Sequence, residues 1–155
     1  MFPPDALLVE ATLADVPVLL DLMRLYYEYD GHPFVEEAAL RGLERLLRDP
    51  SLGVAWIIYD GDDAAGYLVA CYGFALEYAG RDAFIDEFYL KPEYRESGMG
   101  SSALSQAEEL LAGMGVKAFY LLVMPGNDRA EQFYRRAGYD DTGRLLLSKG
   151  LGQDE

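Results

Sequence analysis

The chain has 155 residues and a formal net charge of −14 at pH 7, with 27 acidic residues against 13 basic ones. This length predicts a single domain over residues 1–155, and 51% hydrophobic residues suffice for a proper core. We expect no nucleic-acid or membrane partner, because no basic stripe can displace counterions from phosphates. The negative charge favours cationic small molecules such as amines, or it simply keeps the protein soluble.

The N-terminal sequence and the cysteine content predict a cytoplasmic protein. No apolar run reaches the roughly 18–20 residues of a membrane span, and "MFPPDALLVE" lacks the basic start of a signal peptide. Cys71 is the single cysteine, so an internal disulfide is excluded. Its apolar neighbours in "GYLVACYGF" indicate packing within a strand, and no His or Asp stands close to it in sequence to raise its thiolate fraction.

The first part of the chain predicts one strand and two helices. Residues 6–11, "ALLVEA", have a strand pattern, and Asp15 can cap a following helix with Pro17 in its first turn. The helix is indicated by apolar residues at helical spacing, which are Leu19, Leu22, Met23 and Tyr26. After "DGHP", residues 35–49 predict a second amphipathic helix that ends before Pro50.

The middle of the chain predicts an antiparallel meander of three strands. Residues 54–59 and 64–77 are joined by the turn sequence "DGDD" and form a hairpin, and residues 83–90, "AFIDEFYL", follow after another turn.

The last part predicts a helix over residues 102–115, a buried strand over 117–123, a helix over 128–138 that stops at Gly138, and one or two strands within 139–151. The whole order predicts an α/β fold of the α+β type, with a mixed sheet and helices on both faces.

The glycines of "RESGMGSSALSQAEELL", residues 95–111, allow two interpretations. Gly98, Gly100 and Ala103 satisfy the G-x-G-x-x-G/A spacing of a dinucleotide fold. Three observations count against it: a meander precedes the motif, "KPEYRES" is too long for its tight turn, and the next strand ends in "VMPGN" without an acid for a ribose. A P-loop is excluded because no Lys–Ser/Thr pair follows.

In the second interpretation, a helix begins at these glycines and binds a diphosphate. The start of a helix presents unpaired N–H groups and partial positive charge, and glycine lets a phosphate approach the backbone closely. A diphosphate would lie on residues 97–102, and Arg95 can add a charge-assisted hydrogen bond.

This segment resembles the acetyl-CoA loop of the GNAT N-acetyltransferases, (Arg/Gln)-x-x-Gly-x-(Gly/Ala), here Arg95-Glu-Ser-Gly98-Met-Gly100 after "FYLKPEYR". The sequence "LLVMPGNDRAEQFYRRAGY" is similar to a second motif of the same family. The similarity covers most of the chain and is strongest over residues 83–139. One departure is Glu96, where the family commonly has glycine; a carboxylate there opposes a diphosphate unless it points to solvent.

The resemblance implies the GNAT fold, with a central mostly antiparallel sheet, and acetyl-CoA as the cofactor. It implies that Asn127 contacts the pantetheine side and that Tyr134 donates a proton to the departing thiolate. The full set of cofactor-binding residues that we expect is Phe88, Tyr89, Leu90, Arg95, Glu96, Ser97, Gly98, Met99, Gly100, Ser101, Asn127 and Tyr134. Asn127 can also cap the helix that begins at Asp128.

Acetyl transfer needs a neutral amine, yet at a pKa near 10.4 only about one alkylamine in a few thousand is neutral at pH 7. Asp86 and Glu87 are the candidate bases, because charges in a core strand are costly unless they face a cleft. Strand alternation sends them to opposite faces unless a bulge intervenes. Polyamine acetyltransferases look similar here, with paired acids before the loop. Alternatively, one acid faces solvent and the other pairs with an arginine.

The acceptor pocket is expected from the first two helices and the turns of the meander. The candidate substrate-binding residues are Tyr26, Glu28, Tyr29 and Glu77, an aromatic and acidic mixture suited to a cation. The tyrosines can equally be packing at a helix end. His32, between Gly31 and Pro33, is interpreted as a turn residue, and no cluster of residues suggests a metal.

We therefore expect an acetyl-CoA-dependent N-acetyltransferase in which a primary amine attacks directly within a ternary complex. The acceptor is a small amine, a polyamine or a protein amino group. The alternatives are a GNAT-fold module that binds acyl-CoA without transfer, an NAD(P)-dependent oxidoreductase, and a non-catalytic acidic interaction domain. The family resemblance also allows a homodimer.

Overall fold

The computed structural model describes residues 7–152. Contacts along the chain divide it into two compact units, one up to Leu122 and the other from Val123 onward. The expectation that the chain folds as one domain stays a prediction.

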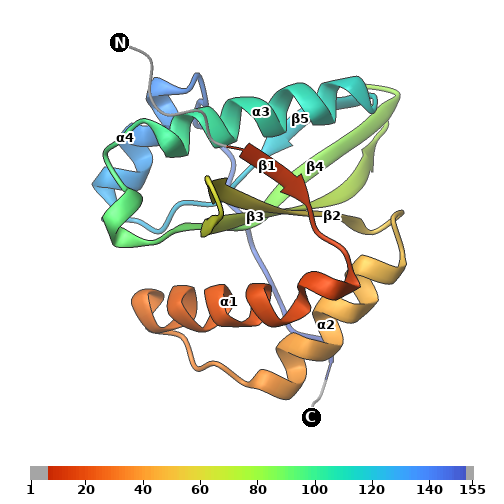
Figure 1. Cartoon of the computed structure of the whole chain (residues 1–155). Helices are drawn as coiled ribbons and strands as arrows, with labels where there is room; N and C mark the ends of the chain where they lie inside the picture. The colour runs from red at the N-terminus through yellow and green to blue at the C-terminus, as the bar shows by residue number, and fades with distance from the viewer. Residues whose placement is uncertain (1–6, 153–155) are drawn as a thin grey trace. The chain divides into compact units, whose positions relative to one another are not determined.

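The first unit is built on a five-stranded sheet whose strands lie in chain order (Figure 1). Its strands are β1 (Leu7–Glu10), β2 (Gly53–Asp60), β3 (Asp63–Ala75), β4 (Gly80–Leu90) and β5 (Val116–Tyr120). The first four pair antiparallel, and β5 pairs with β4 in parallel. This arrangement confirms the predicted mixed, mostly antiparallel sheet and its central meander.

Helices cover both faces of this sheet, as predicted. Figure 1 shows α1 (Val16–Asp30) and α2 (Glu36–Arg48) on one face and α3 (Met99–Gly113) on the other. Strand alternation separates the two cores: Ile57 packs with α1 and α2, whereas its neighbour Ile58 packs with Met99 and Ala103 of α3.

The start of α1 differs in detail from the sequence-based expectation. Asp15 precedes the helix and Pro17 lies in its first turn, but the Asp15 side chain does not cap α1. Instead its Oδ2 accepts a hydrogen bond of 2.8 Å from the backbone N–H of Thr12. The two residues form a capping box for a short 3-10 helix, Leu13–Asp15, that leads into α1.

The second unit contains α4 (Asp128–Arg136). The Asn127 side chain accepts a hydrogen bond of 3.2 Å from the N–H of Ala130, which confirms its predicted capping role. Gly138, with φ of 99°, follows the helix end.

Two of the strand predictions are wrong, the first in part and the second entirely. The strand expected over 117–123 ends at Tyr120, and residues 139–151 form no strand within the described part of the chain. A strand needs a partner edge, and the left-handed backbone of Gly143, with φ of 74°, interrupts this segment. Its large apolar side chains are consequently exposed, and they are Leu145, Leu146, Leu147 and Leu151.

Gly98 is the glycine that the start of α3 requires. It is the N-cap of the helix and has φ of 87°, a conformation that costs a residue with a Cβ roughly 1 kcal/mol or more. We predict that Gly98→Ala lowers the free energy of unfolding by about 1 kcal/mol in urea denaturation. Gly113→Ala, at the other end of α3 where a Cβ meets nothing, should raise it slightly. Equal effects of the two substitutions would contradict this assignment.

Candidate active site

A bulge in β4 places both predicted acids on the same face of the sheet. Val69 of β3 pairs with Glu87 and Ala70 pairs with Ile85, so Asp86 is an extra residue without a partner across the ladder. Such an insertion interrupts the strict alternation of side chains. Asp86 and Glu87 therefore line one cavity, on the face that α1 and α2 cover.

Glu87 is held in place by two tyrosines. The hydroxyl of Tyr27, in α1, donates to its Oε2 at 2.6 Å, and the hydroxyl of the fully buried Tyr67, in β3, donates to its Oε1 at 2.7 Å. Burial raises the pKa of Glu87, the two hydroxyls oppose that rise, and the charge of Asp86 adds to it. With both oxygens already accepting hydrogen bonds, the Glu87 carboxylate is fixed in orientation.

Asp86 is differently placed. Its side chain has no hydrogen bond or ion pair to another residue of the described part of the chain, and it is accessible at the cavity wall. Partial burial raises the pKa of its carboxyl above the ordinary value. Asp86 is thus the acid of the pair whose oxygens are available to a cation or a proton.

The cavity has a volume of about 650 Å³ and mostly apolar walls. It lies between the sheet and the two N-terminal helices, and its lining residues are Met23, Tyr27, Pro33, Val35, Ala38, Ala39, Gly42, Leu43, Arg45, Leu46, Leu52, Val69, Cys71, Asp86 and Glu87. Burial, together with the charges of Asp86 and Glu87, raises the pKa of the Cys71 thiol. A thiol so disposed is not an activated nucleophile, in agreement with the sequence interpretation.

The four residues expected to bind the acceptor are not among those that line this cavity. Tyr26 packs in the core, where its ring lies 5.8 Å from that of Tyr27 and 5.7 Å from that of Tyr89. Burial and nearby carboxylates raise the pKa of Tyr26 to about 12. Glu28 and Tyr29 are exposed near the end of α1.

Glu77 lies in the turn between β3 and β4, and Glu87 lies roughly 23 Å along β4 from the first residue of that strand, Gly80. A substrate-binding role for the four residues stays a prediction. Both N-terminal helices were expected at the acceptor pocket, and both line this cavity, but no residue of α2 was named; the apolar face of its amphipathic pattern, including Ala39, Leu43 and Leu46, was the available signal.

The edge of β4 that faces β5 is only partly paired. Pairing with β5 covers Arg81 to Phe84 and stops just before the bulge. Among the described residues, the ladder with β5 does not continue beyond Phe84, and farther along β4 the carbonyl of Leu90 accepts a hydrogen bond from Arg95. An extended ligand with amide groups, such as a pantetheine arm, could therefore add to the sheet here.

The loop between β4 and α3 directs backbone N–H groups outward at the helix start. A short 3-10 helix, Pro92–Tyr94, leads to Gly98, and α3 begins at Met99. The Ser97 hydroxyl donates to the carbonyl of Tyr94 at 2.7 Å and accepts from the N–H of Met99 at 3.4 Å, which fixes the bend. The first-turn N–H groups have no intrahelical acceptor, so this end can bind an anion.

The distance along the chain between β4 and α3 excludes a dinucleotide-binding fingerprint at these glycines. β4 ends at Leu90 and the loop reaches Gly98 only after the intervening 3-10 helix. The fingerprint places its glycines in a tight turn directly after the strand.

Arg95 connects this loop to β4 and α1. Its Nε donates to the carbonyl of Leu90 at 2.9 Å. Its guanidinium lies 4.4 Å from the ring centre of Tyr29 and 5.4 Å from that of Tyr89. Arg95 therefore stabilises the loop through the strand and two aromatic rings, while its predicted bond to a phosphate stays a prediction.

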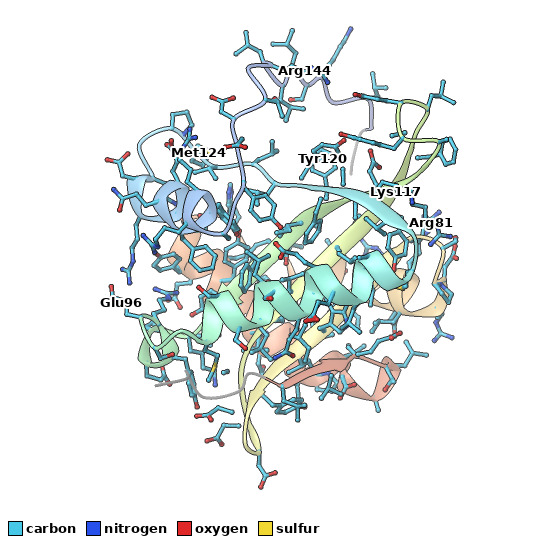
Figure 2. All side chains as sticks on the ribbon, turned by 90° about the horizontal axis from the view of Figure 1, so that it is seen from above. Arg81, Glu96, Lys117, Tyr120, Met124 and Arg144 are labelled. Carbon is cyan, nitrogen blue, oxygen red and sulfur yellow. The ribbon has the colours of Figure 1, made fainter. Side chains whose placement is uncertain are left out.

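Glu96 adopts a backbone conformation that normally favours glycine. Its φ is 61°, which costs a non-glycine residue about 1–3 kcal/mol. Figure 2 shows Glu96 on the loop that leads into α3, whereas the cations Arg81 and Lys117 lie at the far end of that helix. The departure from the motif thus introduces both strain and a negative charge near the N-terminal end of α3.

Tyr134 belongs to the second unit and lies in α4. Its ring contacts those of Phe133 and Tyr139 edge-on, at 5.1 and 5.8 Å between ring centres. Its role as proton donor stays a prediction, as does the contact of Asn127 with the cofactor.

Over residues 7–152, the structure has no helix long and apolar enough to cross a membrane. The same residues contain no group of three or more His, Cys, Asp or Glu side chains that could hold a metal ion.

The model of the Acetyltransferase (GNAT) family matches residues 18–139 of the chain. A thialysine N-epsilon-acetyltransferase of Sus scrofa is 33% identical over 64 residues, which cover 41% of this chain and 38% of the relative. The match thus spans about two fifths of the length of that curated relative.

Two solved structures extend the similarity over nearly the whole chain. An integron cassette protein from the mobile metagenome of Cole Harbour Salt Marsh is 34% identical, with a TM-score of 0.85 and coverage of 95% of this chain and 91% of that one. A predicted acetyltransferase with acetyl-CoA from Clostridium acetobutylicum shares the fold at 16% identity and a TM-score of 0.78, over 93% of this chain and 96% of that one. The chain belongs to the GNAT acetyltransferase family.

The raised pKa of the Asp86 carboxyl predicts how the stability of the folded protein depends on pH. The folded state holds this proton more tightly than the unfolded chain, so stability is lost as pH rises from about 4 through the folded pKa. At pH 7, where this carboxyl is ionised, we therefore expect it to destabilise the folded state. Asp86→Asn should therefore raise the melting temperature by about 1–3 °C at pH 7, and the difference should vanish near pH 3.

Asp62→Asn, in the exposed turn between β2 and β3, is the matched control and should change the melting temperature little. A melting temperature of Asp86→Asn below that of the unaltered protein at pH 7 would show that the Asp86 carboxylate is stabilising instead.

Proposed function

We propose that the protein is an acetyl-CoA-dependent N-acetyltransferase that acts on a primary amine. The single observation that carries the proposal is the bulge that directs Asp86 and Glu87 into one apolar cavity. The family to which the chain belongs, and the name of the pig relative, support the same activity.

The edge of β4 beyond Phe84 and the start of α3 fit acetyl-CoA. Beyond Phe84, where the ladder with β5 ends, β4 offers an edge to the amides of a pantetheine arm, and the α3 N-terminus offers N–H groups to the diphosphate. When bound, the cofactor supplies a thioester whose acyl carbon the amine attacks. Asp86, Glu87 and this edge all belong to β4, so the proposed acceptor site and the proposed cofactor site are built on the same strand.

The acid pair would supply the neutral amine. The Asp86 carboxylate accepts a hydrogen bond from the entering ammonium and takes its proton, while Glu87, held by Tyr27 and Tyr67, adds a fixed negative charge nearby. The raised pKa of both acids brings them closer to neutral pH, where a base is most effective. The Tyr134 phenol is proposed to protonate the departing thiolate.

The proposed chemistry predicts distinct losses of activity. Asp86→Asn and Tyr134→Phe should each lower kcat by about 10²-fold, in the range that one general acid or base contributes, with little change in CoA affinity. Release of free CoA over a panel of amines measures the rate, and calorimetry measures the affinity. Tyr139→Phe, beside Tyr134, is the matched control.

Binding of acetyl-CoA without turnover of any amine would leave only an acyl-CoA-binding module, and a preference for NAD(P) would contradict the proposal outright. If neither ligand raises the melting temperature, a non-catalytic interaction domain is the better explanation. A homodimer, as the resemblance allows, stays a prediction.

Glu96 provides a separate test of the cofactor site. Glu96→Gln removes the charge and keeps the backbone strain, whereas Glu96→Gly removes both. We predict that both variants bind CoA more tightly, by about three- to tenfold, because a like charge near the diphosphate is lost. Only Glu96→Gly also relieves the left-handed strain, partly offset by the greater freedom of glycine in the unfolded chain. Unchanged affinity in both variants would place the diphosphate elsewhere.

A further inference from the structure

We propose that the cavity selects a primary amine with a single positive charge and an apolar body, in preference to a polyamine. This inference rests on the proposed function and names its acceptor class. It follows from the volume of the cavity, from its walls, and from the positions of its charged residues.

The volume and walls of the cavity suit an apolar body. A space of about 650 Å³ lies within the range of small-molecule sites. Its walls come from three elements: α2 contributes Ala39 and Leu43, β3 contributes Val69, and α1 contributes Met23. A hydrocarbon chain or an aromatic ring removes this surface from water, whereas a charged group placed against it loses its hydration without compensation.

Negative charge in the cavity is confined to one place. Asp86 and Glu87 are adjacent on β4 and are the only carboxylates among the lining residues that the structure describes. Asp86 has oxygens available for the ammonium, while those of Glu87 already accept from two hydroxyls. One ammonium can therefore be neutralised at the bulge.

The remaining charged lining residue is a cation. Arg45 lies in the C-terminal half of α2, about 15 Å along the helix from Val35, which lines the cavity at the beginning of α2. Within the described part of the chain it forms no ion pair with Asp86 or Glu87. A second ammonium on the substrate would meet an apolar wall or the Arg45 guanidinium, and either contact opposes its binding.

A pair of substrates that differ in one group tests the selectivity. Hexylamine and 1,6-diaminohexane have the same carbon chain, and only the diamine carries a second ammonium. We expect kcat/KM for hexylamine to exceed that for the diamine by at least about tenfold in the CoA-release assay. Equal values, or a preference for the diamine or spermidine, would overturn the proposal.

Two substitutions locate the effect in this cavity. Gly42 lines the cavity and a Cβ there meets nothing within 4 Å, so Gly42→Leu adds side-chain volume at the cavity wall without a clash at its Cβ. It should raise KM for hexylamine at least about tenfold and leave CoA affinity unchanged, whereas Gly113→Leu, at the end of α3, should do neither. An unchanged KM would show that the acceptor binds elsewhere.

Arg45→Glu reverses the charge and should narrow or invert the preference for hexylamine over the diamine. If it leaves the preference unchanged, Arg45 does not exclude the second cation and the charge argument fails. Calorimetry of both amines with the CoA-bound protein separates this inference from the proposed function. Tighter binding of hexylamine without turnover would support the cavity's selectivity and contradict the transferase activity.

Discussion

The extra residue in β4 is the constraint on which the site depends. In a regular strand Asp86 and Glu87 would face opposite sides, and one of them would meet the core beneath α3. The bulge directs both toward the cavity under α1 and α2. Pairing with β5 ends immediately before it, at Phe84, so the same region of β4 has a carboxylate pair on its face and an edge along which the ladder with β5 does not continue. The proposed acceptor site and the proposed cofactor site therefore both lie next to this bulge.

The environment of the two acids divides their roles. Tyr27 and Tyr67 hold Glu87 by two short hydrogen bonds, and the burial that makes these bonds strong also raises its pKa. Asp86 has a raised pKa without such partners. The raised pKa values predict that the ionised acids lower the stability of the folded chain, a cost that active sites commonly carry because a base must remain available to its substrate. The strained backbone of Glu96 at the start of α3 is a second local cost, in a place where glycine would remove it.

Much of this arrangement could be predicted from the sequence. The meander, both N-terminal helices, α3 and the cap of α4 by Asn127 followed from apolar periodicity and turn residues. The sequence showed that a bulge was needed to place both acids on one face, but it did not predict that the bulge exists. A one-residue shift in register depends on packing against β3 and not on local propensity. The apolar pattern of residues 139–151 predicted strands, but propensity cannot supply a partner strand, and none pairs with it among the described residues. The two helices of the pocket were expected, but the lining residues of α2 and β3 were not named, because which side chains border a cavity depends on how separate elements pack.

The most direct test of the account is a carbon NMR titration of the Asp86 and Glu87 carboxyl groups, with and without hexylamine and CoA. The account predicts that both groups titrate above their ordinary pKa in the free protein, as a coupled pair. It also predicts that the amine lowers the apparent pKa of Asp86, because a bound ammonium favours the ionised form. Ordinary pKa values that do not respond to the amine would show that the two acids do not share a site with the acceptor, and the central claim would fail.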